Sequence, residues 1–202
     1  MVRMNKVIQL QEISQINSGY QFRGDLPELQ PGEWKFIQMR DIDSDNSINQ
    51  DTVINIDFKI KEGPADKYLL NKGDILFKNR GAKNNAAVFN LDWPQVIVSH
   101  QFLIVRTTDN AMIAEYLAWY INSESAQLYF KQHAAGTTTL LIQKKTLEEL
   151  EIVVPSIEIQ KSIVEVEHLR NREKHLVSRK MVLRDKYIDK VLSECINSQR
   201  KK

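Results

Sequence analysis

The stretch that follows Pro155 constrains the fold more than any other part of this sequence. Neither Gly nor Pro occurs from Ile157 to about Cys195. Ser156 is a favourable N-cap, and Glu158 is well placed in a first helical turn. These features predict one continuous helix of roughly forty residues, about 60 Å long at 1.5 Å per residue. A small body cannot cover such a helix, so we divide the chain into residues 1–155 and residues 156–202.

Apolar residues recur along the predicted helix at helical spacing and form one stripe. Its members are Ile159, Ile163, Val166, Leu169, Leu176, Leu183, Tyr187 and Val191. The stripe thins where Arg170 to Lys174 intervene. A long apolar stripe favours pairing with a partner helix in a coiled coil. The alternative is a solvated helix that packs on its own domain at one end only.

Composition narrows the class of protein. The single Cys195 excludes an internal disulfide and fits a reducing, cytoplasmic location. No apolar run reaches the roughly 18 residues of a membrane span, and residues 1–10 lack the apolar core of a signal peptide. The sequence holds no HExxH, CxxC, GxGxxG or phosphate-loop motif, so we expect neither a metal nor another cofactor.

Charge is distributed unevenly between the two parts. The net charge is +2, but residues 156–202 carry 12 Lys and Arg against 7 Asp and Glu. The body is therefore mildly acidic and the helix is basic. If the body binds nucleic acid, its basic residues must gather on one face, because the phosphate backbone supplies most of the affinity.

The body is predicted to be rich in strands. The clearest signal is the alternation of Ile54, Ile56, Phe58 and Ile60 with polar residues, which is typical of a strand with one buried face. Further strands are expected over residues 34–40, 74–78, 86–89, 96–98 and 152–154, with 102–105 continuing or pairing with 96–98. Frequent turns between them suggest a barrel-like or sandwich sheet.

Helical spacing occurs in three places within the body. Residues 7–16 suit one or two helical turns, although a short strand could begin at Val7. Residues 112–120 form a helix capped by Asp109 or Asn110, and a second helix follows from Ser123 or Ser125. Thr146 with Glu149 predicts a capping box on a short helix.

Three polar segments are candidates for nucleic-acid contact. They are residues 20–24, residues 78–85 (KNRGAKNN), and residues 137–145, in which Thr137, Thr138 and Thr139 precede Gln143, Lys144 and Lys145. Arg and Lys suit guanine edges and phosphates, and Asn suits adenine edges. The alternative for each segment is an ordinary solvated turn.

Two other readings of the acidic residues have little support. Asp41, Asp43 and Asp45 resemble the start of a calcium loop, but Asn46 and Thr52 stand where that loop needs Gly and Glu. A metal-dependent nuclease would need paired carboxylates and a lysine. Asp74 and Lys78 are the residues that come nearest to this requirement.

An ordered set of motifs along the chain resembles the specificity (S) subunit of type I restriction-modification enzymes, with one target recognition domain and its adjoining helix. The matching segments are Ser18-Gly19-Tyr20, residues 36–42 (FIQMRDI), residues 70–81 (LNKGDILFKNRG), residues 98–102 (VSHQF), residues 116–123 (YLAWYINS), Gly136-Thr137-Thr138, and residues 150–155 (LEIVVP) through Gln160 and Ile163. Together they span nearly the whole chain.

The resemblance implies an α+β fold, with a β-rich target recognition domain and a few helices over 1–155, followed by a long C-terminal helix that forms a coiled coil. It implies a non-catalytic subunit that binds double-stranded DNA and docks DNA methyltransferase subunits, with a restriction subunit as a further partner. The family usually carries two recognition domains and two helices, whereas this chain has one of each. We therefore expect a homodimer that reads a bipartite target. The alternatives are that the second half comes from a different half-subunit, or that the chain is a truncated fragment. A stand-alone DNA-binding or regulatory protein is the alternative.

Transferred to this sequence, the resemblance places a set of polar side chains against DNA. These are Arg23, Arg40, Lys78, Arg80, Lys83, Asn84, His100, Thr138 and Lys144. Gly73, Asp74 and Gly81 are expected to serve the fold. The apolar stripe from Ile159 to Val191 becomes the expected dimer contact.

Overall fold

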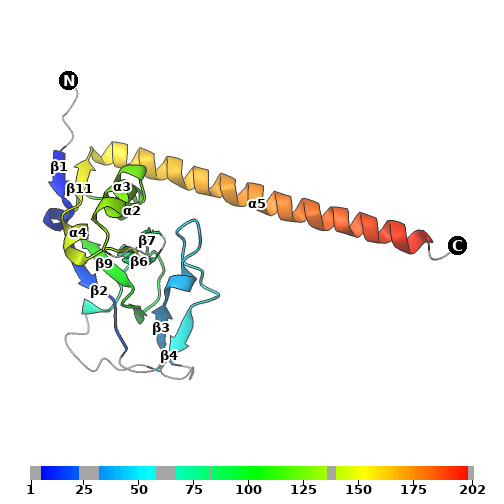
Figure 1. Ribbon diagram of the computed structural model, residues 1–202, viewed down its shortest axis with the longest axis horizontal. Helices are drawn as coiled ribbons and strands as arrows, with labels where there is room; N and C mark the ends of the chain where they lie inside the picture. Colours follow the sequence, from blue (N-terminus) through cyan, green and yellow to red (C-terminus); the bar gives the residue numbers. More distant parts are fainter. Residues whose placement is uncertain (1–5, 23–31, 58–66, 82, 136–139, 200–202) are drawn as a thin grey trace. The chain divides into compact units, whose positions relative to one another are not determined.

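The computed structural model describes residues 6–22, 32–57, 67–81, 83–135 and 140–199. The chain separates into two compact units, Met1–Lys161 and Ser162–Lys202. Unit 1 holds the strands and short helices, and unit 2 is the continuation of one long helix. The chain is thus an α+β protein with a β-rich domain and a long C-terminal helix, as the sequence predicted (Figure 1).

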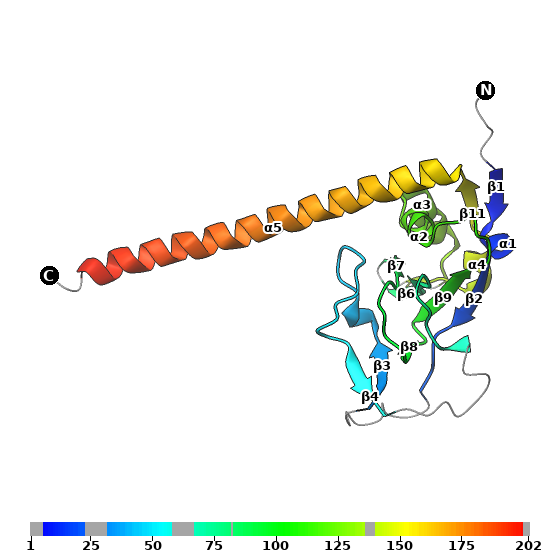
Figure 2. The ribbon, with the colours of Figure 1, turned by 180° about the vertical axis from the view of Figure 1, so that it is seen from behind.

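The N-terminal segment is mostly extended rather than helical. It forms β1 (Lys6–Gln9), the single turn α1 (Leu10–Ile13) and β2 (Ser14–Ser18). The helical spacing holds only in α1, and the alternative of a short strand at Val7 is what forms, because β1 pairs antiparallel with β11 (Glu151–Val154) far along the chain. Figures 1 and 2 show these two strands side by side. Long-range pairing has overridden the local spacing.

A four-stranded antiparallel sheet forms the centre of unit 1. Its order is β2-β9-β5-β7, where β5 is Ile75–Lys78, β7 is Ala86–Val88 and β9 is Phe102–Thr107. Ile75, Leu76 and Phe77 are fully buried, because both faces of β5 are covered. The segment between β5 and β7 returns the chain antiparallel, as predicted, and contains β6 (Arg80–Gly81). β6 pairs in turn with β10 (Leu140–Leu141).

A separate three-stranded sheet has the order β4-β3-β8. Its strands are β3 (Trp34–Ile37), β4 (Ile54–Ile56) and β8 (Val96–Val98). β3 runs antiparallel to β4 and parallel to β8 (Figure 2). The prediction that residues 102–105 continue or pair with 96–98 was wrong, because β9 pairs with β2 and β5. Residues of both sheets, such as Val98 and Ile104, share one buried core, so the predicted barrel-like or sandwich arrangement is not contradicted. Asp57 lies just beyond β4, and residues 58–60 of the predicted strand lie outside the described residues.

Three helices complete unit 1, and two of them begin at other residues than predicted. α2 (Ala114–Ile121) has Ile113 as its N-cap, and α4 (Lys144–Glu148) has Gln143. Asp109 instead accepts the Ala111 amide in a turn before α2, and Thr146 lies inside α4. α3 (Glu124–His133) begins as predicted, with the Ser123 hydroxyl accepting from the Ala126 amide.

A buried ion pair fastens the four-stranded sheet to a neighbouring loop. Arg106 on β9 donates from Nε to Asp74 Oδ1 at 2.8 Å and from an Nη to Oδ2 at 2.6 Å. The same guanidinium reaches the Leu69 carbonyl, and Asp74 also accepts the Asn71 amide. Asp74 is only 2% exposed, so its carboxylate serves the fold, as expected.

The long helix is α5 (Ile157–Gln199), which is 43 residues long and uninterrupted. Its first turn belongs to unit 1. There Gln160 is fully buried, accepts the Ile113 amide and donates to the Ala111 and Pro155 carbonyls. The first turn of α5 is thereby tied to the N-terminus of α2, whose leading amide would otherwise lack a partner.

Candidate nucleic-acid interface

Four loop segments of unit 1 meet beside β6. Ile37 accepts the Ser99 amide, Gln101 accepts the Asn79 amide at 3.1 Å, and Asn79 accepts the Ile142 amide at 2.8 Å. A Cβ placed on Gly81 would lie 3.2 Å from Met39 Cε, so the 3-10 turn Met39–Asp41 also borders β6. We call this set, residues 38–41, 78–81, 83–85, 99–101 and 140–144, the loop cluster.

The loop cluster brings together most of the cations that the sequence singled out. Arg40, Arg80, Lys83, His100 and Lys144 all belong to it and all are exposed. Two of these cations have an acidic neighbour: Arg40 Nε lies 3.8 Å from the buried Asp41, and Lys144 lies 3.4 Å from Glu148. A contact as long as 3.8 Å and a largely exposed pair contribute little, and they leave both cations available to phosphate oxygens.

Lys78 differs from the other cations because its amine is half-buried. Burial lowers the pKa of Lys78, and the nearby Asp43 carboxylate partly opposes that shift. A half-buried ammonium at the end of β5 costs folding free energy, and groups with such a cost are concentrated at functional sites. A phosphate oxygen bound to this amine would replace the hydrogen bonds to water that burial removes.

Asn84 and Asn85 hold the cluster together from within. Asn84 is 3% exposed and its amide donates to the Lys78 carbonyl at 3.0 Å. Asn85 donates to the Asn46 side chain at 2.7 Å. Gly81, with φ +134°, adopts a backbone conformation that other residues rarely take. The structure thus gives Asn84 a role in the fold, and its predicted DNA contact stays a prediction.

Two amides in the cluster escaped the sequence analysis. Among the described residues, Gln38 Nε2 and Asn79 Oδ1 are buried side-chain atoms without a hydrogen-bond partner. Asp41 Oδ1 is a third such atom, so the cluster holds unsatisfied polar groups in its interior. Only the absence of a partner marks them, and a sequence pattern carries no such signal. The other predicted contacts, Arg23 and Thr138, lie outside the described residues.

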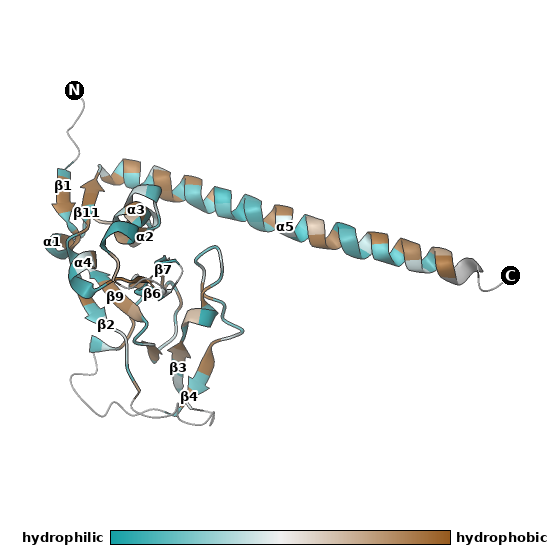
Figure 3. Cartoon of the chain, viewed as in Figure 1, coloured by the Kyte–Doolittle hydropathy of each residue, from teal (hydrophilic) through white to brown (hydrophobic). Residues whose placement is uncertain are grey.

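The predicted contact residues on α5 are mostly exposed. Ile159, Val166, Leu169, Leu176, Leu183, Tyr187 and Val191 are among the exposed large hydrophobic side chains, and Ile163 is half-buried. The sequence analysis missed further exposed apolar residues on the same helix, namely Val177, Met181, Val182, Ile188, Leu192 and Ile196. Figure 3 shows brown and teal alternating along α5.

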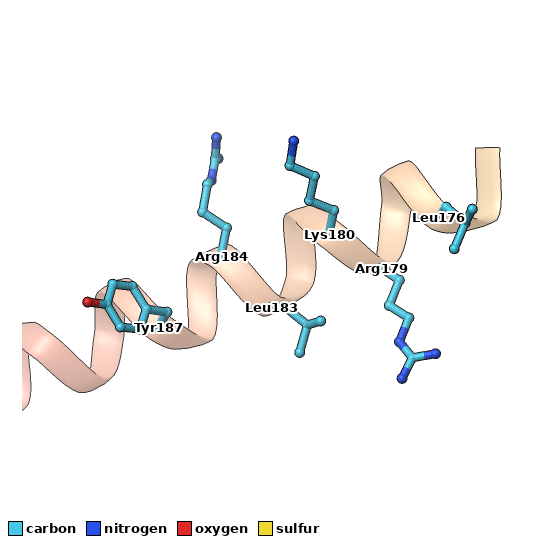
Figure 4. Close-up of a pocket in the computed structure, with 6 residues that line it drawn as sticks. All are labelled: Leu176, Arg179, Lys180, Leu183, Arg184 and Tyr187. Carbon is cyan, nitrogen blue, oxygen red and sulfur yellow. The ribbon is translucent and has the colours of Figure 1, made fainter. Parts of the chain in front are cut away.

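A shallow open hollow lies along the second half of α5. Leu176, Leu183 and Tyr187 line it together with Arg179, Lys180 and Arg184. In Figure 4 Lys180 and Arg184 project to one side of the helix, whereas Leu183 and Arg179 point to the other. The apolar row is therefore bordered by cations on both sides.

Neither a metal site nor a membrane span emerges from the described part of the chain. No cluster of three or more His, Cys, Asp or Glu there is arranged to hold a metal ion. Within the same ranges, no helix combines the length and the apolar character that crossing a membrane requires.

Solved structures share this fold at low sequence identity. The HsdS subunit from Thermoanaerobacter tengcongensis matches 86% of this chain with a TM-score of 0.61 and 16% identity. The type I restriction-modification S subunit from M. genitalium matches 88%, with 0.56 and 16%. A structure describing complex assembly and conformational transition of the type I R-M system matches 89%, with 0.62 and 17%.

The match covers only part of those proteins. It spans 39%, 42% and 41% of their respective chains, so this chain is equivalent to about two fifths of each. A comparison with curated proteins gives no match. The family model for the type I restriction modification DNA specificity domain matches residues 3–167, which include unit 1 from residue 3 onward and the start of unit 2. This chain belongs to the family of type I restriction-modification DNA specificity domains.

Proposed function

We propose that this chain is the DNA-reading component of a type I restriction-modification complex, and that unit 1 reads one half of a bipartite target. The family match over residues 3–167 is the observation that carries this proposal. Its chemistry is recognition without catalysis. The proposed partners are double-stranded DNA and DNA methyltransferase subunits, and a restriction subunit is a further one.

The loop cluster is the proposed DNA contact. Its exposed cations, Arg40, Arg80 and Lys83 among them, suit phosphate oxygens and guanine edges. The body carries a slight net negative charge, so a local concentration of cations is what a DNA contact on this unit requires. Arg23 and Thr138 are proposed as further contacts.

A homodimer through α5 is the proposed way to assemble a complete reader. The solved S subunits are more than twice as long as the matched part, which a second copy could supply. The exposed apolar residues of α5 support pairing with another helix. A two-fold dimer would present two identical recognition units and read an inverted repeat with a spacer.

Methylome sequencing of cells with and without this chain tests the proposed complex. We expect a bipartite adenine-methylation motif to disappear when the chain is deleted and to return with the intact gene. If the methylome does not change while the purified chain still binds DNA specifically, the chain is a stand-alone DNA-binding or regulatory protein instead.

Sedimentation equilibrium of two matched variants tests the proposed dimer. Leu183 and Val182 are adjacent on α5 and similarly exposed, at 56% and 51%, but only Leu183 belongs to the predicted stripe. We expect Leu183→Asp to convert the dimer into a monomer with unchanged helical circular dichroism, and Val182→Asp to leave the dimer intact. A monomeric wild-type chain at micromolar concentration contradicts the homodimer.

A further inference from the structure

Unit 2 carries basic side chains along one face of α5. From His168 they continue in steps of four, three, four and seven residues through Arg172, His175 and Arg179 to Lys186. Steps of three and four, and their sum of seven, return to the same face of a helix. All five side chains are exposed, and Val182 occupies the one other position of this face between them. We call these five residues the basic row, which is about 27 Å long at 1.5 Å per residue.

No carboxylate interrupts the basic row. Between His168 and Lys186 the sequence contains only two acidic residues, Glu173 and Asp185, and neither falls on the row. Arg172 and Arg179 have no Asp or Glu three or four residues away, the spacings at which ion pairs form along a helix. Within the part of the chain that the structure describes, neither guanidinium takes part in an ion pair. Both charges therefore remain available to a partner.

An ordinary solvated helix face has a different pattern of charge. Such a face commonly mixes the two signs, because opposite charges three or four residues apart stabilise the helix. Pairs of this kind occur elsewhere on α5, where Arg170 lies 3.1 Å from Glu167 and Lys190 lies 3.9 Å from Glu194. The basic row lacks that stabilisation, and an anionic partner would supply it.

The length and the sign of the basic row favour duplex DNA as its partner. A single phosphate group is too small to engage cations along about 27 Å, whereas a duplex presents phosphates over about eight base pairs in that length. Of the chain's 28 Lys and Arg and 26 Asp and Glu, residues 156–202 carry 12 and 7, so residues 1–155 carry 16 and 19. The excess of cations that phosphate binding requires thus lies on the C-terminal helix and not on the body.

Other cations of α5 point away from the basic row. In Figure 4 Arg179 points to one side of the helix, whereas Lys180 and Arg184 project to the other. Arg179 also borders the hollow that Leu176 and Leu183 line. The basic row therefore flanks the apolar stripe without being part of it. Helix pairing through the stripe and phosphate binding through the row use different side chains.

We infer that the basic row binds the phosphate backbone of duplex DNA and reads no base sequence. Arg172, Arg179 and Lys186 supply the cationic contacts, and the imidazoles of His168 and His175 donate hydrogen bonds to phosphate oxygens. The inference rests on the proposed function, in which unit 1 supplies the sequence specificity, and it adds a second DNA contact on the same chain. Part of the affinity for DNA is then independent of the loop cluster.

Fluorescence anisotropy of the full-length chain with a random-sequence duplex of about 30 base pairs, longer than the row, tests this contact at several salt concentrations. We expect the double variant Arg172→Gln, Arg179→Gln to bind at least about tenfold more weakly at about 0.1 M salt. The slope of log binding constant against log salt concentration should decrease in magnitude by about two, one for each lost phosphate contact. The matched control is Lys174→Gln, Lys180→Gln, which removes the same charge from the same stretch outside the row and should leave the slope unchanged. The conservative double variant Arg172→Lys, Arg179→Lys should retain the slope, because lysine also binds phosphate as a point charge.

Glutamine is a good helix former, so helical circular dichroism should be the same in all variants. Equal losses of affinity in the row variant and in the control would show an effect of net charge alone and overturn the inference. Wild-type affinity of the row variant for the duplex also overturns it, and loss of the dimer or of a methyltransferase subunit in that variant would make the row a protein contact. Binding through the row by a chain whose deletion leaves the methylome unchanged supports the inference and removes the proposed complex.

Discussion

At the scale of single residues, the Asp74–Arg106 pair stabilises unit 1. Removing Asp74 takes the carboxylate partner from the partly buried Arg106 and the acceptor from the Asn71 amide, a kind of change that typically costs about 3–5 kcal/mol. We therefore expect Asp74→Ala to lower the free energy of unfolding by about that amount in urea denaturation. The control is Asp92→Ala, which breaks the exposed Lys72–Asp92 pair and should cost less than about 1 kcal/mol. Equal effects of the two substitutions would contradict a special role for the buried pair.

We expect the Lys78 amine to lower the stability of the fold and to strengthen DNA binding. Its pKa is lowered chiefly by burial, so the charged amine is unfavourable in the folded state at neutral pH, and this cost disappears as pH rises above the folded pKa. Lys78→Met should therefore keep or raise the urea midpoint at pH 7 while weakening DNA binding. The slope of log binding constant against log salt concentration should decrease in magnitude by about one, the change expected for one lost phosphate contact. Lys131→Met on α3, an exposed lysine outside the loop cluster, is the matched control.

At the scale of elements, Tyr116 joins α2 to β11. Its hydroxyl donates to the Val153 carbonyl at 2.7 Å, and burial, with a smaller contribution from Tyr120, raises the pKa of Tyr116 to about 12. The folded state holds the Tyr116 proton more tightly than the unfolded state does. The resulting contribution to folding stability is fully present below the unfolded pKa of 10.0, and it is lost as pH rises towards 12.

The corresponding variant is Tyr116→Phe. It should lose about 1 kcal/mol at pH 8, because the Val153 carbonyl loses its donor. Urea midpoints measured from pH 8 to 11 should fall more steeply for the wild type than for the variant. Parallel pH profiles for the two proteins would show that the hydroxyl does not titrate within this range.

At the scale of the whole molecule, a two-fold reader has a fixed distance between its half-sites. We expect electrophoretic mobility shifts to show tight binding only to an inverted repeat with one spacer length. Adding about five base pairs, half a helical turn, moves the second half-site to the opposite face of the duplex and should abolish the gain from the second half. A direct repeat of the same half-site is the control. Equal affinity for the inverted repeat, the direct repeat and a single half-site contradicts a two-fold reader.

Local patterns predicted much of this protein. The absence of Gly and Pro after Ser156 predicted α5, because an unbroken run of helix formers needs no distant partner. Alternating or clustered apolar residues likewise located β5, β7, β8 and β9. The cations of residues 78–85 were identifiable because residue type alone indicates affinity for phosphate.

Other features were decided only by contacts between distant segments. Residues 7–9 form a strand because β11 pairs with them. β8 pairs with β3 and not with β9, so the two strands belong to different sheets. The convergence of Arg40, Lys78, Arg80, His100 and Lys144 depends on backbone hydrogen bonds between loops far apart in sequence. The sequence by itself thus determined the helical rod, most strands and the candidate cations, since these follow from local backbone preference and charge. Tertiary structure decided which strands pair and which side chains share a surface, since those depend on burial and hydrogen bonding across the chain.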